Sequence, residues 1–281
     1  ALCIDAIAPK GLLEVVHATA DICDSSGSVT VVANPKGENM SNVIFSGVDS
    51  IVLTAGQNYT LNTAQATIAK VGVTGTAGNL SKAGTITRTS ILGSANADLL
   101  VGGSEADTLI GGAGNDTLTG GAGQDTFIFS GAASGTNGNG SDTITDFAVG
   151  SNGDFINISP FMSRASGSGL TTLTPTGNAT ATTGYVYVYK LATTAISGKN
   201  YAGADFGTLF GSSNTPLSTA TASGSWIKDV LVVQGSDVTQ IYFIDNQVDG
   251  VSTDISAQDV GLVGTLVSVN ATANFVSANF V

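Results

Sequence analysis

The sequence predicts an all-β fold, in which a right-handed parallel β-roll at residues 91–159 is flanked by β-rich regions at 1–90 and 160–281. Three observations favour this fold class. Thr, Val, Ser and Ala, interrupted by Gly and Asn, fill most of the chain, as in short strands joined by tight turns. Few stretches carry Leu, Glu, Lys and Arg at a 3.6-residue period, so little helix is expected. A nine-residue repeat occupies the centre of the chain.

The N-terminal region, residues 1–90, carries strand-like segments bounded by turn residues. The expected strands lie within 28–33 ("SVTVVA"), 42–56 and 58–62 ("NYTLN"). One short helix is expected at 63–70 ("TAQATIAK"), with Thr63 as its N-cap. The only cysteines are Cys3 and Cys23, whose spacing fits no metal site. They are either two free thiols or, in an extracellular protein, a disulfide.

The C-terminal region, residues 160–281, contains further strand patterns at 184–191, 229–234, 239–245 and 264–269. In "GYVYVYKL" the alternation places Tyr185, Tyr187 and Tyr189 on one face of a strand. Such a face either packs through aromatic cross-strand pairs or binds a ligand, and the packing interpretation is favoured.

The central region repeats every nine residues as "GSANADLLV", "GGSEADTLI", "GGAGNDTLT" and "GGAGQDTFI", from residue 93 to residue 128. The sixth position is always Asp: Asp98, Asp107, Asp116 and Asp125. The eighth is always large and apolar: Leu100, Leu109, Leu118 and Phe127. Six Gly-rich residues can turn sharply, and the next three form a short strand whose middle residue points inward. Two units then complete one coil. A flexible linker would not keep Asp and an apolar residue in register through four units.

Stacked coils bring successive Asp carboxylates together, and such a column repels itself unless cations are present. Ca²⁺ suits Gly-rich turns because it accepts six to eight oxygen ligands, backbone carbonyls included, in irregular geometry. Mg²⁺ fits less well because it requires a strict octahedron. The region lacks His and Cys, which argues against Zn²⁺ and Cu²⁺. Calcium binding and folding of the roll are therefore expected to be one event.

At these residues the sequence resembles the RTX family, the haemolysin-type calcium-binding repeat proteins of bacteria, a nonapeptide class known to bind Ca²⁺. The match is strongest at "GGAGNDTLTGGAGQDTF" (111–127), and "GSDTITDFAVGSNGDFINIS" (140–159) is similar to the segment that closes such rolls. In that family one ion lies between turn n and turn n+2. Carbonyls at positions 2 and 4 and the Asp of the first turn bind it, together with carbonyls at positions 1 and 3 and the Asp of the second.

The resemblance implies four calcium sites. The first would use Ser94, Asn96, Asp98, Gly111, Ala113 and Asp116. The second would use Gly103, Glu105, Asp107, Gly120, Ala122 and Asp125. Gly112, Gly114 and Asp116 would begin a third, and Gly121, Gly123 and Asp125 a fourth, with Asp142 as a candidate partner.

The family resemblance also implies export by a type I channel of a Gram-negative cell, with an uncleaved C-terminal signal. The base-free stretch after Lys228, ending "VNATANFVSANFV", is similar to such signals. A net charge of −12 disfavours nucleic acid and anionic membranes as partners. No apolar run approaches the ~20 residues of a membrane helix.

Catalytic motifs are scarce in this chain. His17 is the only histidine, and neither a G-x-S-x-G elbow nor a P-loop occurs. "DNQVDG" (245–250) starts like an EF-hand calcium loop. Its twelfth position is Ser256, where that loop requires Glu, so the motif is not complete. We therefore expect no enzyme. The expected function is a calcium-dependent secreted surface structural protein, an S-layer or matrix-adhesin component that self-associates. The alternative is the calcium-folding and secretion module of a larger RTX enzyme or toxin.

Overall fold

The computed structural model describes residues 90–93, 97–102, 106–129, 140–162, 170–173, 179–180, 184–211, 217–218, 227–246 and 255–281; before residue 90 it describes the backbone of the strands. The chain divides into two compact units, residues 1–128 and 129–281. Nearly all of the described secondary structure is strand. Among the described residues, no helix is both long enough and apolar enough to cross a membrane.

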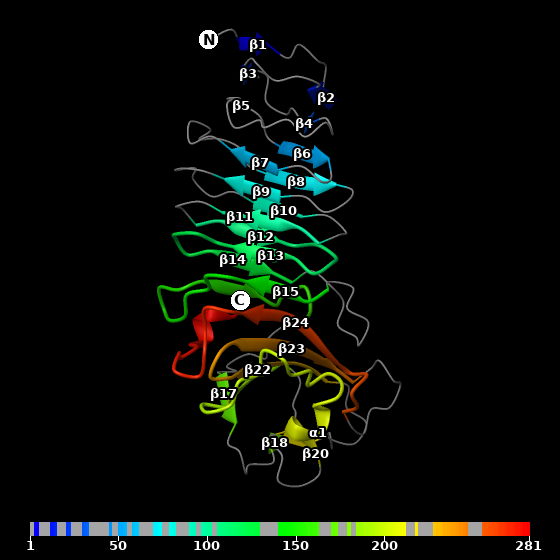
Figure 1. The fold of residues 1–281 in the computed structure, drawn as a ribbon, viewed down its shortest axis with the longest axis vertical. Helices are drawn as coiled ribbons and strands as arrows, with labels where there is room; N and C mark the ends of the chain where they lie inside the picture. Colours follow the sequence, from blue (N-terminus) through cyan, green and yellow to red (C-terminus); the bar gives the residue numbers. More distant parts are fainter. Residues whose placement is uncertain are drawn as a thin grey trace. The chain divides into compact units, whose positions relative to one another are not determined.

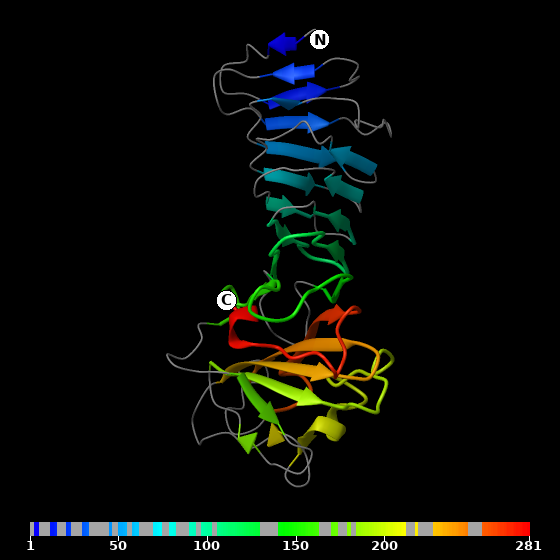
Figure 2. The ribbon, with the colours of Figure 1, turned by 90° about the vertical axis from the view of Figure 1, so that its left-hand side faces the viewer.

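The first unit is a parallel β-roll with strands stacked on two faces (Figures 1 and 2). The first face consists, in order, of β2 (Leu12–Val15), β4 (Thr30–Ala33), β6 (Ser50–Thr54), β8 (Lys70–Thr74), β10 (Ser90–Leu92), β12 (Thr108–Ile110) and β14 (Thr126–Ile128). The second consists of β7 (Asn58–Leu61), β9 (Asn79–Lys82), β11 (Leu99–Val101) and β13 (Thr117–Thr119). The predicted parallel roll is confirmed.

The register fixes the length of each coil. Leu109 pairs with Phe127, and Leu100 with Leu118, so two nine-residue units form one coil. Each three-residue strand buries its middle residue and leaves its neighbours more exposed. Leu100, Leu109 and Phe127 are 0% exposed, and Leu118 is 1% exposed. The interior column predicted from position 8 is therefore present.

The roll continues on the N-terminal side of the nonapeptides with longer coils. Ser50 pairs with Lys70, and Lys70 pairs with Ser90, so each of these coils spans 20 residues. Lys70 begins β8, so the predicted helix at 63–70 is wrong at its last residue; residues 63–69 lie outside the described part. Pairing on both sides of β8 overrides the local helical preference at this position.

A third, smaller sheet joins β1 (Cys3–Asp5), β3 (Asp21–Cys23) and β5 (Phe45–Ser46) in parallel. Cys3 lies opposite Asp21, while Cys23 lies opposite Asp5. The side chains of Cys3 and Cys23 lie outside the described part of the chain, so the two alternatives for them, free thiols or a disulfide, stay predictions.

The second unit contains a mixed sheet in the order β17 (Leu170–Leu173), β19 (Val186–Lys190), β22 (Lys228–Gln234), β23 (Thr239–Asp245), β24 (Val260–Leu266) and β15 (Asp142–Ile144). β16 (Phe155–Asn157), α1 (Phe206–Leu209) and the 3₁₀ turn η1 (Ser277–Asn279) accompany it. A small sheet joins β18 (Ala179–Thr180), β21 (Leu217–Ser218) and β20 (Phe210–Gly211). β19, β22 and β23 fall on three of the predicted strands, whereas β24 begins four residues before the fourth.

The tyrosine-rich strand β19 belongs to the core of the second unit. Tyr187 and Tyr189 are only 3% and 6% exposed and pack in one cluster with Leu231, Val233 and other apolar side chains. Tyr185 is partly buried and stacks on Tyr187 with ring centroids 6.1 Å apart. The burial of these rings favours the packing interpretation of this face.

The last fifteen residues are an integral part of the second unit. Lys190 Nζ donates to the carbonyl oxygen of Ala273 at 2.7 Å, and Gln234 Nε2 donates to that of Asn270 at 3.0 Å. The buried Asn279 amide donates to the carbonyl oxygens of Asp154 at 2.8 Å and Gly150 at 3.1 Å. These bonds attach the C-terminal segment to residues 36 to 129 positions earlier in the chain.

Candidate metal-binding turns

The four repeat aspartates are buried. Asp98 is 4% exposed, and Asp107, Asp116 and Asp125 are each 1% exposed. The sequence contains no Lys, Arg or His from residue 89 to residue 163, so no basic side chain from this stretch balances their charge. Burying ionised carboxylates costs several kcal/mol per group unless they meet a cation or strong hydrogen-bond donors. The turns therefore concentrate negative charge where a cation is stabilising.

Hydrogen bonds connect aspartates one coil apart. The Asp98 N–H donates to Asp116 Oδ1 at 2.8 Å, and the Asp107 N–H donates to Asp125 Oδ1 at 2.7 Å. The Asp98 carbonyl oxygen in turn accepts from the Thr117 N–H at 2.8 Å. The structure thus brings together the aspartates of turns n and n+2, as the predicted sites require.

The first glycine of each unit lies where oxygen atoms converge. A Cβ added to Gly93 would collide with the carbonyl oxygen of Gly111 and would lie 2.8 Å from Asp98 Oδ2. Gly102 stands in the same relation to Gly120 and Asp107. Because glycine has no Cβ, one carboxylate oxygen and one carbonyl oxygen can approach each of these positions closely. These oxygens belong to predicted ligands of the first site and of the second.

The glycines at positions 2 and 4 of the last two units adopt backbone conformations that other residues rarely adopt. Their φ angles are 109° at Gly112, 111° at Gly114, 97° at Gly121 and 121° at Gly123. Positive φ costs an L-residue with a Cβ roughly 1–2 kcal/mol. The glycines at these positions therefore permit the sharp turns from which the carbonyls would reach an ion.

Several predicted ligands are not placed by the structure. Ser94, Asn96, Gly103 and Glu105 lie outside the described residues. Asp142 lies in β15 of the second unit and is 0% exposed. Within the described ranges, no three His, Cys, Asp or Glu side chains gather as a metal site. A metal site in these turns would therefore need backbone carbonyls beside its aspartates, which suits a hard cation. The ligand assignments stay predictions.

The donor set fits Ca²⁺. The polar atoms nearest to the position-1 glycines are carboxylate and carbonyl oxygens, and oxygen is the ligand that Ca²⁺ prefers. A scan against protein-family models matches residues 92–127 to the RTX calcium-binding nonapeptide repeat, in four copies. The chain carries RTX repeats. The match covers the strictly periodic part of the first unit, which contains the turns at Asp98, Asp107, Asp116 and Asp125. A search of curated proteins found no significant match.

The sequence-based reasoning missed the role of the first RTX position. Gly111 and Gly120 were predicted to bind calcium only through their backbone carbonyl oxygens. No role was predicted for Gly93 or Gly102. The structure shows that all four face the Asp carboxylate of their own unit. The available signal was that position 1 is Gly in every unit, including the degenerate "GSANADLLV", where position 2 is Ser.

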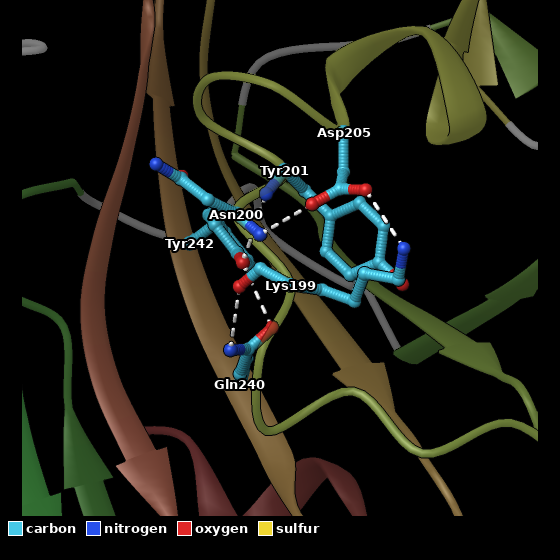
Figure 3. A network of polar contacts seen from close by, with 6 residues as sticks. All are labelled: Lys199, Asn200, Tyr201, Asp205, Gln240 and Tyr242. Atoms are coloured by element: carbon cyan, nitrogen blue, oxygen red, sulfur yellow. Dashed lines mark hydrogen bonds and ion pairs between the residues drawn. The ribbon is translucent and has the colours of Figure 1, made fainter.

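A second polar cluster lies in the second unit, where the loop before α1 packs against β23 (Figure 3). Its members are Lys199, Asn200, Tyr201, Asp205, Gln240 and Tyr242. Tyr242 Oη donates to Gln240 Oε1 at 2.9 Å and accepts the Tyr201 N–H at 3.3 Å. Burial, followed by the nearby Asp205 charge, raises the pKa of Tyr201 to about 12, and burial also raises the pKa of Tyr242. Both phenols are neutral at physiological pH, and the cluster holds a loop rather than activating a nucleophile.

Asp237 fastens the β22–β23 turn to the same loop. Its carboxylate accepts the N–H groups of Ile196 at 2.8 Å, Ser197 at 3.1 Å and Val238 at 2.9 Å. Burial raises the pKa of Asp237, but these bonds outweigh it and lower the pKa from 3.8 to about 2.

The segment 245–250, which starts like a calcium-binding loop, has a structural role at its two described residues, Asp245 and Asn246. Asp245 forms an ion pair with Lys228 at 3.2 Å, and Asn246 Oδ1 accepts the Ile227 N–H at 2.6 Å. Both residues are buried. The turn interpretation is therefore favoured over a surface calcium site; Asp249 lies outside the described residues.

Proposed function

We propose that this chain is a calcium-dependent structural protein, secreted to the cell surface of a Gram-negative bacterium, where it self-associates as an S-layer or matrix-adhesin component. The observation that carries the proposal is the run of RTX calcium-binding turns with buried carboxylates inside a parallel roll. Such turns are stable only where Ca²⁺ is available, which is the situation outside the cell.

The remaining composition supports a structural role without catalysis. His17 is the only histidine of the chain, and charged residues make up only 11%. The described tyrosine clusters pack in the core rather than lining a site. We therefore propose no enzymatic activity and no nucleic-acid partner.

Export through a C-terminal signal is part of the same proposal. The segment 267–281 is bonded into the second unit in the folded chain, so a receptor would contact it only before folding. Low calcium inside the cell would keep the RTX region unfolded during passage.

The experiment is calcium-dependent assembly of the purified chain. We expect sheets or filaments by electron microscopy, and increased light scattering, when Ca²⁺ is added, both reversed by a chelator. A chain that folds with Ca²⁺ but stays monomeric would contradict the surface-layer role. It would support the alternative, a folding and secretion module of a larger RTX enzyme or toxin.

A further inference from the structure

Both sheets of the roll run without interruption from the RTX coils into the preceding coils. On one face β12 pairs with β10, β10 with β8, and β8 with β6, all in parallel. On the other face β11 pairs with β9, and β9 with β7. Leu109 thus has register partners in Ile91, then Val71, then Ile51. The family match, by contrast, begins only at residue 92.

The coils before residue 92 lack the chemistry of the RTX turns. No Asp or Glu occurs from residue 50 to residue 97. On the first face the residue before the strand is Asp125 at β14, Asp107 at β12, Thr89 at β10 and Ala69 at β8, and an Asp returns at this position only before β6, at Asp49. On the second face it is Asp116, then Asp98, then Gly78, then Gln57. The strands β7, β8, β9 and β10 therefore have no carboxylate at the position of the RTX aspartates, although the sheets continue through them.

A coil in a stacked array depends on its neighbours. The stability of such arrays is approximately a sum of intrinsic coil terms and nearest-neighbour interfaces. Folding a 20-residue coil costs conformational entropy for the backbone of every residue. The strands that offset this cost by hydrogen bonding are only three to five residues long. Parallel pairing also joins residues distant in sequence, which makes it slow to form alone. A neighbouring coil already fixed by an ion supplies the missing template.

We propose that calcium bound in the RTX turns holds the metal-free coils of residues 50–92 folded, by templating β10 and β9 on β12 and β11. This inference rests on the calcium-dependent folding proposed above. The calcium-controlled part of the chain is then residues 50–128 rather than the 36 residues matched by the family model. Calcium would set the order of a segment that has no acidic ligand of its own.

Hydrogen exchange measured by mass spectrometry on the full chain tests this coupling. On adding a chelator, we expect amide protection in β6, β8 and β10 to fall at least tenfold, together with that of residues 97–128. The variant Ile91→Pro removes an N–H from the middle of β10 and interrupts the ladder. In saturating Ca²⁺ we expect this variant to lose protection at 50–74 and to keep it at 106–128. The matched control Ile91→Val keeps the N–H and should behave like the parent chain.

The outcomes separate the two proposals. If the chelator lowers protection at 97–128 but leaves 50–92 equally protected, the coupling is wrong while calcium-dependent folding of the RTX turns stands. Full protection of 50–74 in the Ca²⁺-loaded Ile91→Pro variant would also overturn the coupling. If the chelator changes protection in neither segment, the proposed calcium-dependent function fails, and the coupling fails with it.

Discussion

Replacing Asp116 should damage the roll more than replacing Asp98, because Asp116 has more partners. In the predicted sites Asp98 belongs to one calcium ion, whereas Asp116 ends the first site and begins the third. The structure adds a second difference. Asp116 Oδ1 accepts the Asp98 N–H at 2.8 Å within the buried turn. Asp98→Ala leaves that hydrogen bond in place because it uses the Asp98 backbone.

The magnitudes follow from these contacts. At a free calcium concentration ~100 times the dissociation constant, each lost ion removes about 2.7 kcal/mol of stability. Loss of a buried hydrogen bond to a charged group costs about 2 kcal/mol more. Asp98→Ala should therefore cost about 3 kcal/mol and Asp116→Ala about 7 kcal/mol. Asp116→Asn keeps an acceptor oxygen for the Asp98 N–H and should fall between them.

The assay is titration calorimetry for the number of bound ions, combined with urea unfolding in saturating Ca²⁺. We expect Asp98→Ala to lose one ion and Asp116→Ala to lose two, with unfolding midpoints in the same order. Equal stoichiometry and equal midpoints in the two variants would refute the assignment of Asp116 to two sites.

Three further results are expected. Gly111→Ala should weaken calcium binding at least tenfold and cost about 1–3 kcal/mol, because its Cβ would overlap Asp116 Oδ2; Gly198→Ala, with no atom within 4 Å, should change neither calorimetric affinity nor melting. Asp237→Asn should cost about 1–2 kcal/mol at neutral pH in urea unfolding. It should also remove the stability that the parent chain loses as pH falls from about 4 to about 2, the interval between its unfolded and folded pKa. Asn279→Ala should destabilise the second unit by about 2–4 kcal/mol, because buried carbonyls lose their donors; an unchanged urea midpoint would contradict this.

The RTX coils were predictable because their chemistry is strictly periodic. Asp at position 6 and Leu or Phe at position 8 specify one turn and one inward residue in each unit, and the register of Leu109 with Phe127 agrees. The pairing of Asp98 with Asp116 also followed from the spacing. The close approach of oxygen atoms to Gly93 did not, because it depends on a carbonyl of the next coil.

The longer coils were missed because their period is carried by less distinctive residues. Apolar residues recur every 20 positions at Val31, Ile51, Val71 and Ile91, and the turns between them share no motif. A search at 20-residue spacing would have found this pattern. The short helix expected before Lys70 was a local prediction, and parallel pairing with neighbouring coils decided the conformation of that residue.

The most direct test of the central claim is circular dichroism of the full chain with saturating Ca²⁺ and with a chelator. Because cations are proposed to stabilise the buried carboxylates of the RTX roll, we expect the chelator to reduce the strand signal and lower the melting temperature, and added Ca²⁺ to restore both. Identical spectra and an identical melting temperature in the two conditions would contradict calcium-dependent folding of this protein.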